Sequence, residues 1–333
     1  MSIQEDSENL CSIKRKDFNK IFYNFFTTED ITEKIWWDKS KLYNNYEIHK
    51  IHLKDPQDID KFLYNVFEHI ITFSGEKFNK YTIDTLKYKE SIEFLKKYFD
   101  NIDNELQSLT KEDLDNKKLQ WKISWIKEIW EIILFFLLEW FLKSPIVISK
   151  LQTKTSNKMP VFWADWIHLS SNYSKILFWE AKLNNKFSYW KTQSRDSIEW
   201  FISKEWIVKF ELKVITSQLN NIPKNKNNII WDLINPYYNW NENIKNLPYE
   251  ITCLLWYEDE NYKLFLEDKN KQKYEEALFG KIGDLLSYYK LKNKELESKK
   301  IIFFLLPFID ILEFLKTYWL KVREEENLEK VRK

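Results

Sequence analysis

Residues 161–183 read VFWADWIHLSSNYSKILFWEAKL, two apolar runs separated by a polar cluster. The runs at residues 161–169 and 175–183 have the length and the aliphatic and aromatic content of β-strands. Between them lies Ser-Ser-Asn-Tyr-Ser, a composition typical of a turn. This stretch therefore predicts a β-hairpin.

Two acidic residues and one lysine fall on the predicted hairpin. Asp165 lies on the first strand, while Glu180 and Lys182 lie two residues apart on the second and so share one face. Pairing across the hairpin can bring Asp165 beside them. Mg²⁺ prefers oxygen ligands, and a metal with a nearby lysine suits phosphodiester hydrolysis. The pattern indicates a metal-dependent nuclease centre.

The Glu-x-Lys spacing alone has little weight, because lysine is abundant and Glu297 with Lys299 repeats the spacing. The candidate differs in that an apolar strand leads into it and an aspartate lies at hairpin distance upstream. A solvated edge strand with an ordinary salt bridge is the alternative. The residues alone leave both interpretations open.

Helix and strand patterns alternate from residue 120 onward. We expect an apolar helix over 123–142, the hairpin, a helix over 192–205, strands over 250–257 and 299–307, and a helix over about 309–322. This order predicts an α/β (α+β) fold with a central mixed sheet flanked by helices. Segments 58–73 and 92–102 show helical spacing, so we expect a largely helical accessory region over residues 1–118, with a nuclease-like domain over residues 119–333.

Composition excludes several classes of protein. The 52 Lys and Arg residues balance 51 Asp and Glu residues, so any positive surface for nucleic acid must be local. Two cysteines exclude a disulfide scaffold and fit a reducing cytoplasm. No apolar run approaches the roughly 20 residues of a membrane span, and the acidic N-terminus is unlike a secretory signal. We expect a cytoplasmic protein with no membrane partner.

Glycine is scarce and tryptophan abundant, with 3 and 16 residues respectively. Average usage predicts about 23 glycines in a chain of this length. Tryptophan also occupies turn-like contexts such as Asn239-Trp240-Asn241 and Trp36-Trp37-Asp38. We hypothesise that UGA codons, which specify glycine in the source organism, have been translated as tryptophan. A truly tryptophan-rich protein is the alternative, and the codons distinguish the two.

The run from Met159 to Leu183 resembles the HamA family, the nuclease subunits of Hachiman antiphage defence in the PD-(D/E)xK restriction-endonuclease-like superfamily. The family motif reads like Gly-x-Asp-Gly-x-His on one strand and Gly-Glu-x-Lys on the next. The corresponding residues are Trp163-Ala164-Asp165-Trp166-Ile167-His168 and Trp179-Glu180-Ala181-Lys182. Each departure is tryptophan in place of glycine, and Trp130-Glu131 likewise stands at a Gly-Glu step. The resemblance runs from about residue 128 to the C-terminal helix.

The resemblance implies a restriction-endonuclease-like core in which Asp165 and Glu180 bind Mg²⁺, or Mn²⁺, and Lys182 is the catalytic lysine. It implies that Glu131 adds a carboxylate, although a polar-face helix residue is an equal alternative. His168 falls on the strand face opposite Asp165, which favours a structural role. The implied partners are DNA and a HamB-like helicase, which the N-terminal region could dock.

Lys150, Lys154 and Lys158 lie in a stretch without acidic residues directly before the hairpin. We expect them to contact phosphates, with a solvated basic loop as the alternative. Two rival functions remain: a non-catalytic DNA-binding or interaction subunit with a degenerate nuclease fold, and an enzyme acting on RNA or another phosphodiester.

The recoding hypothesis gives a first prediction. Bulky tryptophans beside Asp165 and Glu180 occupy positions where the backbone must pass closely, so the chain as written should fold poorly or lack activity. A version with all 16 tryptophans replaced by glycine should melt at a higher temperature and be more active. Equal melting temperatures and activities in the two proteins would count against the hypothesis.

Overall fold

The computed structural model describes part of the chain. The described residues are 22–26, 46–51, 53, 58–59, 62, 110, 130–131, 133–144, 146–149, 166–171, 174–183, 187–204, 208–209, 212–213, 231–235, 237, 246–267, 270–290, 299–318 and 320. Asp165, Lys150, Lys154 and Lys158 lie outside these ranges.

A seven-stranded mixed sheet forms the centre of the fold, in the order β1-β2-β7-β6-β5-β4-β3. The strands are β1 (Phe22–Phe26), β2 (Tyr46–Ile51), β3 (Ile146–Ser149), β4 (Trp166–Leu169), β5 (Ile176–Leu183), β6 (Tyr249–Glu258) and β7 (Lys300–Phe308). The four strands β2, β7, β6 and β5 are parallel to one another. Antiparallel strands extend this parallel core on both sides: β1 beside β2, and β4 then β3 beside β5.

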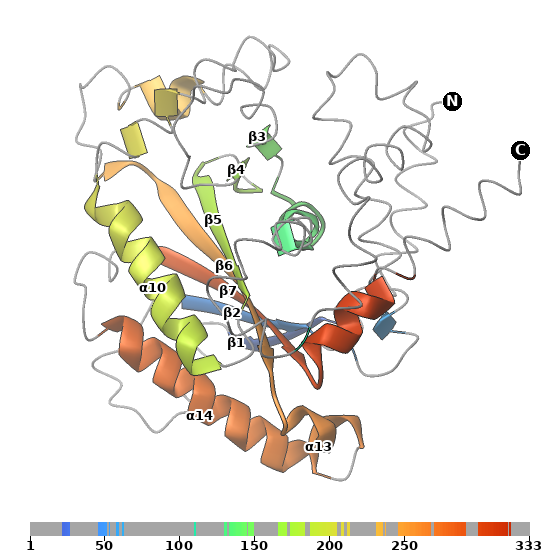
Figure 1. Cartoon of the computed structure of the whole chain (residues 1–333). Helices are drawn as coiled ribbons and strands as arrows, with labels where there is room; N and C mark the ends of the chain where they lie inside the picture. The colour runs from blue at the N-terminus through green and yellow to red at the C-terminus, as the bar shows by residue number, and fades with distance from the viewer. Residues whose placement is uncertain are drawn as a thin grey trace, which may run out of the picture.

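Helices cover both faces of the sheet (Figure 1). The long helices α10 (Phe187–Ser203) and α14 (Lys271–Lys290), with the short α13 (Tyr262–Leu266), lie on one face, called here the α10 face. On the other, the η2 face, residues 130–131 and 133–136 are helical and continue into the π-helical turn η2 (Leu137–Phe141), and residues 311–318 form a second helix. Among the described helices, none is long and apolar enough to cross a membrane.

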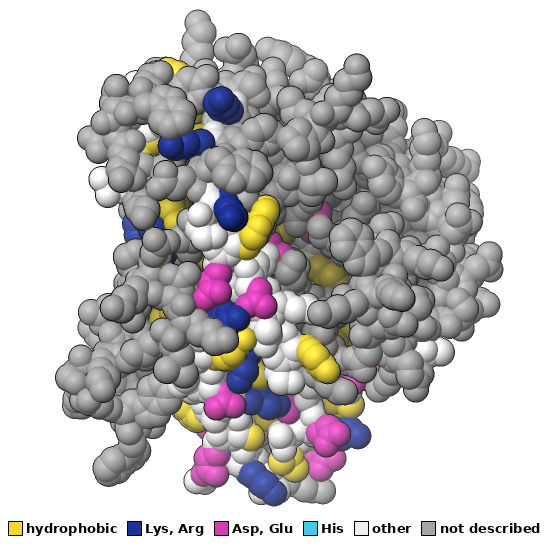
Figure 2. Space-filling view, turned by 60° about the vertical axis from the view of Figure 1, so that its left-hand side comes forward, with side chains coloured by type: hydrophobic (Ala, Val, Ile, Leu, Met, Phe, Trp, Pro, Cys, Tyr) yellow, Lys and Arg dark blue, Asp and Glu magenta, His cyan; other side chains and the backbone are white. Residues whose placement is uncertain are grey.

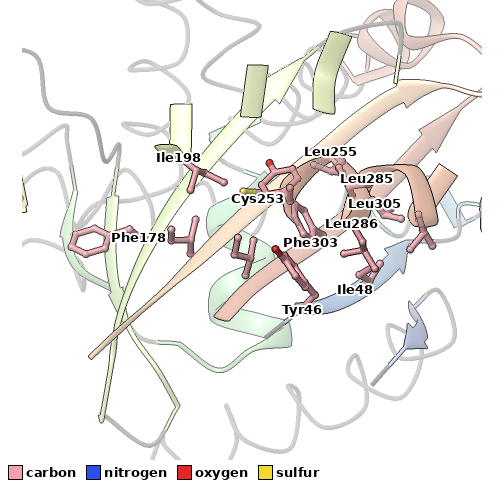
Figure 3. Packing of buried hydrophobic residues seen from close by; sticks show 14 of the residues in the cluster. Tyr46, Ile48, Phe178, Ile198, Cys253, Leu255, Leu285, Leu286, Phe303 and Leu305 are labelled. Carbon is pink, nitrogen blue, oxygen red and sulfur yellow. The ribbon is translucent and has the colours of Figure 1, made fainter. Parts of the chain in front are cut away.

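The sheet is apolar on both faces because its parallel strands are covered twice. Every residue of β6 except Glu258 is buried, which explains its nearly continuous apolar sequence. On the α10 face, Phe178, Cys253 and Leu255 pack with Ile198 of α10, as Figure 3 shows. Burial on this scale is the main stabilising contribution to the fold.

The expected α/β fold with a central mixed sheet is confirmed. The hairpin is present as β4 and β5, the helix expected at 192–205 is α10, and the strands expected at 250–257 and 299–307 are β6 and β7. Strand β3 and the two N-terminal strands were not expected. Residues 58–59 and 62 are helical as expected. The same N-terminal region also contains β2, which joins the central sheet by pairing with β7. The division at residue 118 stays a prediction, but strands from both sides of it share one sheet.

Lys50 at the end of β2 is fully buried under α13 and α14. Its Nζ lies 3.8 Å from the ring centroid of Tyr274 and 4.6 Å from that of Phe265, so aromatic rings surround it where the protonated form would need hydration. Burial lowers the pKa of Lys50 to about 6, with Asp259 and Glu275 opposing the shift. The lysine is therefore largely neutral in the folded protein near pH 7.

We predict that Lys50→Met raises the melting temperature at pH 7 by about 2–10 °C. In the unfolded chain lysine keeps its proton up to a pKa of about 10.5, so between pH 10 and pH 6 the unfolded state binds more protons. The free energy of unfolding therefore falls as pH falls through this window, and the gain from methionine should be larger at pH 6.5 than at pH 9. Lys263→Met, at an exposed position of α13, is the control. A pH-independent gain would contradict the prediction.

Candidate nuclease site

Glu180 and Lys182 lie near the carboxyl end of β5. Side chains alternate along this strand, with Phe178 packed on the α10 face and Trp179 and Ala181 on the η2 face. Alternation therefore places Glu180 on the α10 face, where its strand neighbour on β6 is Cys253. Only 5% of Glu180 is exposed. Burying a carboxylate costs free energy unless a charge or hydrogen bonds compensate, so a nearby cation suits this position.

The described pairing of β4 with β5 stops just before these residues. Ile167 pairs with Phe178 and His168 with Leu177, whereas β5 remains paired with β6 as far as Leu183. Lys182 pairs with Leu255, and its side chain is outside the described part of the structure. Glu180 and Lys182 thus lie beyond the described part of the β4–β5 pairing, and β6 is the described strand neighbour of both residues.

Glu131 lies on the helix that precedes η2 and is 4% exposed. Its neighbour Trp130 contacts Trp256, which pairs with Leu183 at the end of β5. The structure therefore brings Glu131 to the same end of the sheet as Glu180. The helix of Glu131 nevertheless covers the η2 face, whereas Glu180 is directed to the α10 face by alternation.

His168 is buried and joins β4 to the end of the η2 helix. The π-helical turn ends at Phe141. Lys143, two residues further on, has a positive φ of 52°, and the Ser144 N–H donates to the carbonyl of Leu138 at 2.9 Å. His168 Nδ1 lies 2.9 Å from the carbonyl oxygen of Ser144, and its ring packs on Phe135. Burial lowers the pKa of His168 to about 4, so the imidazole is neutral near pH 7 and its Nδ1–H donates to the Ser144 carbonyl. This environment agrees with a structural role.

Basic side chains on α10 already have partners. Lys191 lies 3.9 Å from Asp284, and the Arg195 guanidinium contacts Asp196 and lies 4.3 Å from the ring centroid of Tyr288. Figure 2, turned so that the side carrying α10 comes forward, shows acidic and basic side chains interspersed over the described surface. The described part of this face therefore carries mixed charge.

Three or more potential metal ligands do not gather anywhere in the described ranges. Asp165 is not among the described residues, so this search did not include the complete centre predicted from Asp165, Glu180 and Lys182. Glu180 by itself fits a divalent cation, since it is an oxygen ligand held on a rigid strand.

A further polar cluster at this end of the sheet escaped the sequence analysis. Asp259, directly after β6, accepts from Lys281 Nζ at 2.7 Å. Tyr257 is fully buried on the α10 face and packs against Phe187 at the start of α10. The position of Asp259 directly after an apolar strand could have indicated this cluster in the sequence, because polar residues just beyond the carboxyl ends of parallel strands often belong to binding sites.

The chain is an α/β protein in which a helix, β3, β4, β5, α10 and β6 follow in that order. Glu180 and Lys182 near the carboxyl end of β5 form its candidate site. The sequence model of the HamA family matches residues 126–318, more than half of the chain. The chain belongs to the HamA family, which indicates a component of Hachiman defence. No curated protein and no solved structure matches it.

The neutral state of His168 gives a pH-dependent prediction. The unfolded chain takes up a proton at about pH 6.5 and the folded chain only at about pH 4, so the free energy of unfolding falls as pH drops between these values. His168→Gln should melt lower at pH 7, because a buried hydrogen bond is perturbed, yet lose less between pH 7 and pH 5 than the parent protein. Thermal melts at the two pH values test this. An equally steep loss in both proteins would contradict it.

Proposed function

We propose that the protein is a metal-dependent nuclease that cleaves DNA in Hachiman antiphage defence. The observation that carries the proposal is the placement of Glu180 and Lys182, two residues apart at the end of a rigid central strand, within a chain of the HamA family. Buried acidic groups at the carboxyl ends of parallel strands are typical of functional sites.

The β4–β5 register supports Asp165 as the second ligand. Ile167 pairs with Phe178 and Leu169 with Ile176, so continuation of the same register by two residues would set Asp165 opposite Glu180. Directly opposed residues of an antiparallel pair have Cβ atoms about 4.5–5.5 Å apart, close enough for two carboxylates to share one cation.

Each residue then has a distinct part in the chemistry. Asp165 and Glu180 would hold Mg²⁺ or Mn²⁺, which would supply positive charge to polarise the scissile phosphate and acidify the attacking water. Lys182, on the same face as Glu180 by alternation, orients the attacking water and offsets the charge that develops on the phosphate oxygens.

Further residues extend this proposal. Glu131, buried at the same end of the sheet, is an additional carboxylate from the opposite helical layer. Lys150, Lys154 and Lys158 contact the DNA backbone, because phosphate contacts from lysine give affinity without sequence preference. A HamB-like helicase is the expected partner.

We predict that cleavage of plasmid DNA requires Mg²⁺ or Mn²⁺ and falls by about 10²-fold or more in Lys182→Ala and Glu180→Gln. The matched control is Glu250→Gln, which removes an equally buried glutamate from the adjacent strand β6, 6% exposed against 5% for Glu180. Glu250 contacts Lys175 rather than the proposed centre, so the folded variant should keep its activity.

Three results would distinguish the alternatives. DNA binding without cleavage in parent and variants alike would identify a non-catalytic DNA-binding subunit with a degenerate nuclease fold. Lys182-dependent cleavage of RNA but not DNA would identify RNA, in place of DNA, as the substrate. Equal cleavage by the parent and Lys182→Ala would remove the catalytic assignment altogether. Adding chelator and then excess Mg²⁺ separates loss of metal from loss of fold.

A further inference from the structure

Two buried indoles meet too closely at the end of the sheet. The ring centroids of Trp130 and Trp256 are 3.2 Å apart at an interplanar angle of 66°. Aromatic pairs in edge-to-face arrangements keep their centroids about 4.5–7 Å apart, so these rings compete for one volume. The contact lies between the helix that precedes η2 and the carboxyl ends of β5 and β6.

Neither indole has the polar partner that a buried tryptophan usually finds. Trp130 and Trp256 are 2% and 0% exposed, and within the described part of the chain neither Nε1 has a hydrogen-bond partner. A buried donor without a partner costs free energy in addition to the steric overlap. The contact between Trp130 and Trp256 is therefore destabilised by steric overlap and by buried donors that lack a described partner. A smaller residue at one of the two positions would reduce both costs.

The surroundings distinguish the two residues. Trp256 stacks on Phe308 at 5.0 Å and meets the edge of Phe314 at 5.5 Å, both ordinary aromatic distances. Among the described rings, Trp130 meets only Trp256. Removing the side chain of residue 130 therefore relieves the overlap and leaves a normal aromatic cluster. Removing that of residue 256 would dismantle this cluster.

We infer that residue 130 is glycine in the functional protein, through UGA read as glycine, and that Trp256 is a genuine tryptophan. The expectation that all 16 tryptophans stand for glycine therefore does not extend to residue 256. The inference does not depend on nuclease activity. Glycine at 130 also frees the volume beside Glu131, at the end of the sheet where Glu180 and Lys182 lie.

The test compares the melting temperatures of single variants of the full chain. Trp130→Gly should melt about 2–10 °C higher than the chain as written, because an overpacked core is relaxed. Trp256→Gly should melt lower than Trp130→Gly. The matched control is Phe135→Gly, a fully buried aromatic residue of the same helix with an ordinary contact to His168, which should melt well below the parent protein.

Mass spectrometry of the protein from its native cells gives an independent readout. Fragment spectra of the tryptic peptide 128–143 should show a glycine residue mass at position 130, and peptide 246–263 should retain tryptophan at 256. Tryptophan at 130 in the native protein, or a Trp130→Gly variant destabilised as much as Phe135→Gly, would overturn the inference. A glycine mass at 256 would overturn the assignment of Trp256.

Discussion

Parallel pairing of β2, β7, β6 and β5 is the constraint on which the other features depend. A parallel sheet needs cover on both faces, so both helical layers follow from it. It also aligns the carboxyl ends of four strands at one edge. Lys182 pairs with Leu255, Leu255 with Leu305, and Leu305 with Lys50, so two lysines far apart in sequence stand in one row across the sheet.

Several buried charged side chains of the described residues lie at this edge. Glu180 and Glu131 are almost fully buried there, Asp259 is ion-paired with Lys281, and Lys50 is held among aromatic rings. Such groups weaken a core and are kept where a binding or catalytic function needs them. Buried polar groups also occur at the opposite ends of the strands, where Glu250 of β6 is 6% exposed and pairs with Lys175. At the carboxyl ends, the buried charged groups coincide with the proposed site.

The sequence predicted the local parts of this arrangement better than the long-range ones. The apolar run at residues 176–178 with Glu180 and Lys182 predicted β5, because strand periodicity and turn residues are local signals. Strand β2 could not be found in the same way, because Tyr46–Ile51 becomes a strand by pairing with β7. The faces of Glu131 and Glu180 also depended on helix packing, which no spacing rule specifies. Conversely, the excess of tryptophan is visible in the sequence, but only the packing of the two side chains distinguishes the proposed glycine position 130 from the tryptophan at 256.

The pairing of β2 with β7 has a consequence for synthesis of the chain. Tyr46 pairs with Ile301, so the N-terminal strands emerge from the ribosome long before their partner exists. Contacts of such large sequence separation form slowly, and the edge of β2 that pairs with β7 stays exposed until β7 has been made. The strand that carries Glu180 therefore gains its complete supporting sheet only after β6 and β7 have been made. Truncated or stalled products would lack that support for the strand that carries Glu180.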